Sequence, residues 1–327
     1  MKKRILSGMR PTGRLHLGHL VGALNNWVKL QDDCQCFYMV ADWHALMSEY
    51  EDPKILKESC YEMVRDFVAA GLDPDRSVIF IQSHVPEHLE LAMVFSDLTP
   101  LAWVERVPTY KEQLREIKGR DLTTYGFLGY PVLQAADIAI YKANAVPVGV
   151  DQVPHLELTR EIIRRFNSLY KKDLFPEPEA ILTKTSRLLG IDNRKMSKSF
   201  ANFIALSDTA DAIKKKVSVM ITDAERIRLN DKGHPDICNV FSYFSIFAKP
   251  DVKANVRDWC EGAKRGCTDC KKNLAEILLT HLDPIRTRRD KLADADVEDI
   301  IRSGAKRARA AAAETMDEVK SLINFVV

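Results

Sequence analysis

A turn with two glycines and two histidines follows the first predicted strand, at residues 11–19, which read PTGRLHLGH. Such a turn can bind phosphates, because the helix N-terminus behind it offers free N–H groups and a partial positive charge. His16 and His19 are three residues apart and share one helix face, so both could contact a triphosphate. The alternative is an ordinary helix start with two surface histidines.

A second basic segment, residues 195–199, reads KMSKS. Its lysines, Lys195 and Lys198, flank a serine on a polar loop. Such lysines can act as mobile point charges that stabilise a pyrophosphate leaving group as its charge develops. A lone Lys-x-x-Lys pair is more often a solvated charged loop, so this segment is informative only together with the first.

The pair formed by HLGH at 16–19 and KMSKS at 195–199 resembles the paired signatures of class I aminoacyl-tRNA synthetases. The resemblance implies that an amino acid carboxylate attacks the α-phosphate of ATP, which is bound with Mg²⁺, and that pyrophosphate leaves. That reaction needs positioning and charge stabilisation, without a protein nucleophile. The catalytic residues would be His16, His19, Lys111, Lys195 and Lys198.

Runs at 7–13, 130–138, 146–152 and 155–160 are similar to the tryptophanyl branch of this family. The resemblance covers nearly the whole chain and implies L-tryptophan, ATP and tRNA(Trp) as partners, in a homodimer. Tyrosyl-tRNA synthetase is the nearest alternative, since it shares the fold and a similar nucleotide loop. A small-molecule nucleotidyltransferase with the same His-x-Gly-His turn is another, although such an enzyme needs no helical C-terminal third.

Asp137 is predicted to select the indole ring. Indole has a single hydrogen-bond donor, and a substrate without that donor would leave a buried carboxylate unpaired, at a cost of several kcal/mol. Its neighbours Ala135, Ala136 and Ile138 argue against a surface acid. The resemblance implies further tryptophan contacts from His44, Tyr130, Gln134, Val146, Val148 and Gln152. His44 could equally be an ordinary core histidine.

The same resemblance assigns the ATP contacts. They would come from Arg10, Pro11, Thr12, Gly18, His19, Gly149, Val150, Asp151, Leu188, Lys195, Met196, Ser197, Lys198 and Ser199. Three positions depart from the common pattern of the family: Arg10 replaces a glutamine, Gln134 a methionine, and Val150 an acid. Arg10 could add a phosphate contact, whereas Gln134 leaves the lining of the indole edge open.

Four cysteines lie close together near the C-terminus: Cys238, Cys260, Cys267 and Cys270, spaced C-x21-C-x6-C-x2-C. This spacing predicts a metal site, and four thiolates can hold either Zn²⁺ or an iron–sulfur cluster. A subset of bacterial tryptophanyl enzymes carries a similar pattern that binds [4Fe–4S], and this resemblance favours the cluster. We expect the other three, Cys34, Cys36 and Cys60, to be core thiols.

These residues need a scaffold, and strands and helices alternate in the first half of the chain. Strands are expected at 4–7, 36–42 and 77–82, and helices at 16–31 and 53–70. The alternation predicts an α/β fold with a doubly wound parallel sheet of the Rossmann type. The middle, about 85–145, is expected to be helical, to return to the sheet near 146–149, and to continue with a helix at 154–168.

From residue 207 only helical patterns remain. We therefore expect a catalytic domain at 1–206, whose middle segment would build the dimer surface, and a helical tRNA anticodon-binding domain at 207–327. The formal net charge of +2 gives no global signal for nucleic acid. Local candidates for phosphate contacts are Arg286, Arg288, Arg289, Lys291, Arg302, Lys306, Arg307 and Arg309. Neither a signal peptide nor a membrane-length apolar run is evident, which predicts a soluble, cytoplasmic protein.

Overall fold

The computed structural model describes residues 2–116, 121–182, 188–196 and 200–326. Its centre is one sheet in the order β3-β2-β1-β4-β5, and every neighbouring pair is parallel. The strands are β1 (Arg4–Met9), β2 (Gln35–Val40), β3 (Ser77–Ile81), β4 (Ala145–Val148) and β5 (Glu179–Leu182). The order reverses between β1 and β4, and this switch point is where such sheets bind ligands. The predicted fold class is confirmed.

Alternate residues of each strand face opposite layers of helices, which explains why the strands are apolar throughout. Ile5 and Tyr38 belong to one core cluster, whereas Leu6 and Phe37 belong to the other. The helices before residue 170 are α1 (Leu17–His19), α2 (Asn25–Asp33), α3 (Asp42–Glu49), α4 (Leu56–Ala70), α5 (Glu87–Leu98), α6 (Leu101–Glu105), α7 (Pro108–Glu116), α8 (Tyr125–Ile140) and α9 (Val153–Leu169). A π-helical turn, Leu20–Leu24, joins α1 to α2.

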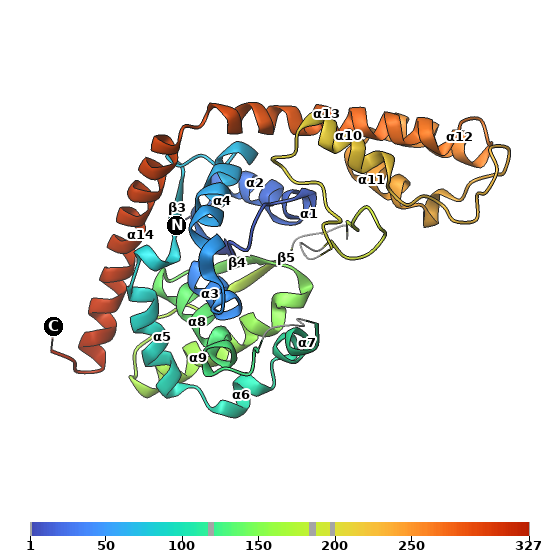
Figure 1. The fold of residues 1–327 in the computed structure, drawn as a ribbon. Coiled ribbons are helices and arrows are strands. Elements are labelled where there is room, and N and C mark those ends of the chain that lie inside the picture. Colours follow the sequence, from blue (N-terminus) through green and yellow to red (C-terminus); the bar gives the residue numbers. More distant parts are fainter. Residues whose placement is uncertain (1, 117–120, 183–187, 197–199, 327) are drawn as a thin grey trace.

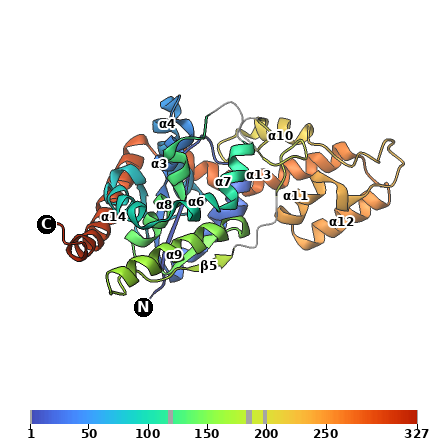
Figure 2. The same ribbon diagram turned by 90° about the horizontal axis from the view of Figure 1, so that it is seen from below.

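Every element that the structure describes beyond residue 207 is helical. These helices are α10 (Ala210–Ser218), α11 (Asn239–Phe247), α12 (Pro250–Glu261), α13 (Cys267–Lys291) and α14 (Asp294–Leu322), with a short 3₁₀ turn at Pro235–Ile237. Figures 1 and 2 both show α10–α13 projecting away from the sheet, while α14 runs back along it. No described helix is long and apolar enough to cross a membrane.

Helix α14 covers the edge strand β3. A Cβ at Gly304 would collide with the carbonyl oxygen of Ile79, so the helix crosses the strand at a glycine in direct backbone contact. Residues of α14 before this point, such as Ile301, join one core cluster, and later ones such as Ala308 join the other. The helix thus shields an edge that would otherwise be free to pair with another chain.

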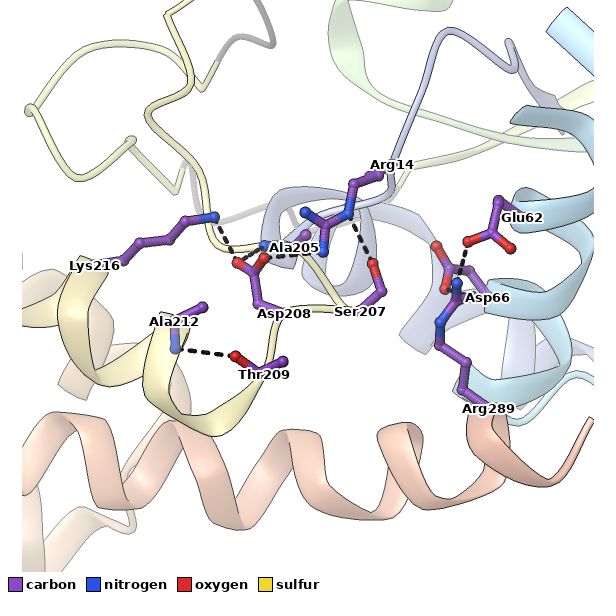
Figure 3. A network of polar contacts seen from close by, with 10 residues as sticks. All are labelled: Arg14, Glu62, Asp66, Ala205, Ser207, Asp208, Thr209, Ala212, Lys216 and Arg289. Atoms are coloured by element: carbon purple, nitrogen blue, oxygen red, sulfur yellow. Dashed lines mark hydrogen bonds and ion pairs between the residues drawn. The ribbon is translucent and has the colours of Figure 1, made fainter. Parts of the chain in front are cut away.

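Arginines of the last two helices bind the first half of the chain. Arg289 on α13 pairs with Glu62 and Asp66 on α4 (Figure 3). Arg307 on α14 donates to two backbone carbonyls next to β3, and Arg309 pairs with a carboxylate on α5. These three candidates for phosphate contacts therefore have intramolecular partners.

Candidate active site

A cavity of about 380 Å³ opens at the carboxyl ends of β1 and β4, at the switch point of the sheet. Its walls come from the ends of the central strands, α3, α8 and the start of α9. The residues predicted from the sequence that line it are Arg10, His44, Tyr130, Gln134, Asp137, Val146, Val148, Gly149 and Gln152. Residues far apart in the chain thus meet in one cavity, as the tryptophan-site predictions require.

Asp137 lines this cavity and is 1% exposed. Its Oδ1 accepts from Gln82 Nε2 at 2.7 Å and from His88 Nδ1 at 2.6 Å, while Oδ2 accepts from His44 Nε2 at 2.7 Å. Burial alone would raise the pKa of Asp137, but His44 and His88 outweigh it and lower the pKa to about 2. The side chain is therefore a carboxylate at neutral pH.

A carboxylate offers about four acceptor positions. Among the described residues, three donors use the Asp137 oxygens, two on Oδ1 and one on Oδ2. The remaining position is on Oδ2, the oxygen that also binds His44, and both Asp137 and His44 line the cavity. Apolar walls from Val146 and Val148 complete an arrangement suited to a flat apolar ring with one N–H.

Tyr130 and His155 form a second polar pair in the cavity. The Tyr130 hydroxyl and His155 Nε2 are 2.7 Å apart. Burial lowers the pKa of His155 to about 4, so the ring is neutral at neutral pH and shares one hydrogen bond with the phenol. A phenol oriented in this way can accept a hydrogen bond from an ammonium group.

Sequence reasoning did not assign His155 to the site, although it lies in the quoted run 155–160. It also missed Gln82 and His88. The contacts of these residues span 25 to 55 positions in sequence, so no local pattern announces them. One local sign pointed to His155: it lies on the first turn of α9, three residues after the predicted site residue Gln152, which is the N-cap residue of that helix.

The first nucleotide segment begins a helix. His16 Nδ1 accepts from the Gly18 N–H at 3.1 Å, and His19 Nδ1 accepts from the His16 N–H at 3.2 Å. This reciprocal capping shows why the two histidines stand three residues apart. A Cβ at Gly18 would lie 3.2 Å from Met196 Sδ, so the second segment already touches the first at this glycine.

The two nucleotide segments are joined through their backbones. The Leu17 N–H donates to the Ile204 carbonyl and the Leu206 N–H to the Leu15 carbonyl, each at 3.0 Å. Ser197, Lys198 and Ser199 lie outside the described residues, whereas Lys195 is exposed at the near end of that loop. The chain that leaves the second segment is therefore fixed to the first.

Asp208 reinforces this junction from beneath (Figure 3). The buried carboxylate accepts from Arg14 Nη2 at 2.9 Å, from Lys216 Nζ on α10 at 2.6 Å, and from the Ala205 N–H at 2.8 Å. One side chain thus connects the turn at 11–19, the chain after the second segment and the first C-terminal helix.

The remaining predicted ATP residues lie in different environments. Val150 and Asp151 are exposed in the turn after β4. Leu188 is only 8% exposed and belongs to the core, so it could reach a nucleotide only through its backbone. Lys111 is exposed on α7 and is not part of the cavity wall.

The four C-terminal cysteines line one small cavity together with Arg226 and Arg265. Burial, and then the other three thiols, raise the pKa of Cys270 to about 12. Among the residues that the structure describes, no group of three or more His, Cys, Asp or Glu side chains is placed to hold a metal ion. Of the other cysteines, Cys36 and Cys60 are buried, as expected for core thiols, and Cys34 is partly buried.

The fold and the paired nucleotide segments define a class I aminoacyl-tRNA synthetase. The family model for class I tRNA synthetases (W and Y) matches residues 1–283. The chain is 52% identical to the tryptophan–tRNA ligase of Thermotoga maritima and 41% identical to that of Aquifex aeolicus, covering 98–100% of each chain. The tryptophanyl-tRNA synthetase of Campylobacter jejuni, solved with ADP and tryptophan, superimposes with a TM-score of 0.89 at 31% identity, covering 98% and 100% of the two chains. This chain belongs to the tryptophan–tRNA ligase family.

Tyrosyl-tRNA synthetase was the nearest alternative. That of Archaeoglobus fulgidus superimposes with a TM-score of 0.65 at 20% identity, which shows a shared fold. The full-length tryptophan–tRNA ligase relatives decide for the tryptophanyl branch.

Proposed function

We propose that this chain binds L-tryptophan and ATP in the cavity at the switch point, forms tryptophanyl-adenylate, and transfers tryptophan to tRNA(Trp). The observation that carries the proposal is the buried Asp137 carboxylate, which lines the cavity beside the apolar side chains of Val146 and Val148 and has one acceptor position left on Oδ2. The Campylobacter jejuni relative, which was solved with ADP and tryptophan, supports it.

In this proposal the amino acid is held at both ends. Asp137 accepts from the indole N–H, and His44, Gln134, Val146 and Val148 surround the ring. Tyr130 and Gln152 bind the ammonium and carboxylate groups. The tryptophan carboxylate is left facing the open end of the cavity, where the α-phosphate of ATP would lie for in-line attack.

ATP would lie between the two nucleotide segments. The adenosine and phosphate contacts would come from Arg10, Pro11, Thr12, Gly18, His19, Gly149, Val150, Asp151, Met196 and the backbone of Leu188. Lys111, His16, Lys195 and, outside the described residues, Ser197, Lys198 and Ser199 would stabilise the departing pyrophosphate. Mg²⁺ bound with ATP would neutralise part of the phosphate charge.

Pyrophosphate exchange with each of the twenty amino acids tests this function. Exchange should depend on tryptophan. Equal or faster exchange with tyrosine would overturn the proposed substrate.

The proposal extends to two regions and to a dimer. Residues 1–206 would carry catalysis, and 207–327 would bind the tRNA anticodon in the cytoplasm. The middle segment exposes large apolar side chains, including Met93, Leu101 and Tyr125, which supports a homodimer surface. Sedimentation of the intact chain should give twice its 37.1 kDa mass, and a monomer at micromolar concentration would contradict this.

The four C-terminal cysteines would hold a [4Fe–4S] cluster, with Zn²⁺ as the alternative. Supporting observations are the shared cavity and the two arginines beside it, which suit an anionic cluster. To ligate a metal, the thiols must approach each other and lose their protons. The cluster would be structural and would position tRNA.

Anaerobically purified protein should contain about four irons per chain. Cys267→Ser should lose the iron and weaken tRNA charging while tryptophan-dependent exchange persists. Cys34→Ser, at a cysteine outside this group, is the matched control. One zinc per chain would decide for the alternative. Protein free of both metals would show that the four cysteines are not metal ligands.

A further inference from the structure

His88 has no place in the reaction described above, yet it is fully buried and both of its ring nitrogens are bonded. It lies on the first turn of α5, and its Nδ1 is 2.6 Å from Asp137 Oδ1. Its Nε2 is 2.8 Å from the Tyr141 hydroxyl at the end of α8. Neither His88 nor Tyr141 lines the cavity, so any effect on substrate must pass through Asp137.

The contacts of His88 fix which of its ring nitrogens donates and which accepts. Because Asp137 is a carboxylate, Nδ1 must carry a proton and donate it. The Tyr141 hydroxyl is buried, and among the described residues His88 Nε2 is its one side-chain partner. A buried hydroxyl proton needs an acceptor, so Tyr141 donates and Nε2 is unprotonated. His88 therefore donates from Nδ1 to Asp137 and accepts at Nε2 from Tyr141.

The same contacts fix how the Asp137 carboxylate is turned. The bond between its Cβ and carboxyl carbon has a broad torsional preference, so neighbours must set the angle. Gln82, at the end of β3, and His88, on α5, both donate to Oδ1. With Oδ1 held from two directions, Oδ2 is directed at His44 and the cavity.

The geometry points to His88 as a positioning residue for substrate selection: it holds Asp137 so that an acceptor position on Oδ2 faces the indole N–H, and Tyr141 keeps the proton of His88 on the correct nitrogen. This inference rests on the proposed role of Asp137 as the indole acceptor. It predicts that His88 matters for substrates that carry the ring N–H and not for isosteres that lack it.

The test compares tryptophan with 3-benzothienylalanine, in which sulfur replaces the ring N–H, in pyrophosphate exchange. His88→Ala should raise the KM for tryptophan about 10- to 100-fold, as expected for losing a hydrogen bond to a charged group, with a smaller change in kcat. The KM for the sulfur analogue should change by less than about threefold. Equal losses for both substrates would show that His88 only fills space.

Two conservative variants separate hydrogen bonding from packing. Asn places its amide nitrogen near the position of Nδ1, whereas Gln places it near Nε2, so His88→Asn should restore most of the preference for tryptophan and His88→Gln should not. Tyr141→Phe should raise the tryptophan KM about 2- to 10-fold. His84→Ala, at an exposed histidine on the same segment, is the matched control. Equal behaviour of the Asn and Gln variants would overturn the inference.

Asp137→Asn separates this inference from the proposed function. If that variant keeps the wild-type preference for tryptophan over the sulfur analogue, the indole-acceptor role of Asp137 itself is wrong. If it abolishes the preference while the His88 and Tyr141 variants retain it, only the role of His88 fails.

Discussion

The two parts of the proposed site, one for the indole ring and one for the phosphates, are built differently. At the indole end, Asp137 and His88 are buried and every donor lies within 2.7 Å of the carboxylate. Where the phosphates would lie, Arg10 in the cavity wall is exposed, as are Asp151 and Lys195, which do not line the cavity. If the proposed roles hold, amino acid recognition is preorganised by the fold, whereas the phosphate contacts would be completed by exposed side chains that become ordered when the phosphates bind. Substitutions near Asp137 should therefore change amino acid selectivity, whereas substitutions of the phosphate contacts should change the rate of activation.

The exposed phosphate end nevertheless has a fixed backbone. Leu15 and Leu17 pair with the chain at 204–206, and Asp208 ties that chain to Arg14. The difference between the two ends thus lies in their side chains, while the main chain is held at both.

The largest effect is expected at the phosphate end. Lys195→Ala should lower kcat for tryptophan activation by the equivalent of about 2–4 kcal/mol, with little change in the tryptophan KM, because the lysine acts on charge present mainly in the transition state. Steady-state pyrophosphate exchange measures both constants. Lys214→Ala, at an exposed lysine on α10, is the control. A raised KM with unchanged kcat would give Lys195 a binding role instead.

A smaller effect is expected at the indole end. Asp137→Asn should lower kcat/KM for tryptophan by about 1.5–3 kcal/mol, because the amide lacks the charge and turns one N–H towards the donors on His44 or His88. Activation kinetics, with thermal unfolding of the same samples, measure it. Unchanged kinetics with tryptophan would place Asp137 outside the reaction.

The pH dependence of stability tests the contact between the buried His155 and the partly buried Tyr130. The pKa of His155 falls from 6.5 in the unfolded chain to about 4 in the fold. The unfolded state therefore binds more protons between these values, and the free energy of unfolding should fall as pH falls from 6.5 to 4, by on the order of 2 kcal/mol. His155→Gln, which keeps an acceptor, should flatten this slope in urea unfolding at pH 7, 5.5 and 4.5. An equal slope in both proteins would contradict the assignment.

The smallest effect is expected beneath the nucleotide segments. Arg14 and Lys216 bind different oxygens of Asp208, and because both cations are partly exposed, each alanine substitution should cost about 0.5–1 kcal/mol of unfolding free energy. Shared attachment to one buried carboxylate predicts that the double variant departs from additivity by about 0.5 kcal/mol or more. Denaturant unfolding of the wild type, the two single variants and the double variant measures this coupling. Strict additivity would show that the two ion pairs act independently.

The sequence by itself determined the alternation of strands and helices and the end of the sheet where the candidate site lies. Apolar runs such as 36–42 and 77–82 are strands because both faces of a parallel sheet are buried, and this pattern is local. The 11–19 and 195–199 segments could also be found locally, because their residue types follow from what a phosphate needs.

Tertiary structure alone decided how the Asp137 carboxylate is held. Nothing near Asp137 in sequence indicates that Gln82, His44 and His88 converge on it, because those donors come from the end of β3, α3 and α5. The return of α14 to the sheet likewise depends on Gly304 meeting the backbone of Ile79, a contact between distant segments. Hydrophobic period and turn chemistry are encoded within a few residues, whereas the orientation of a buried charge depends on which donors the completed fold brings to it.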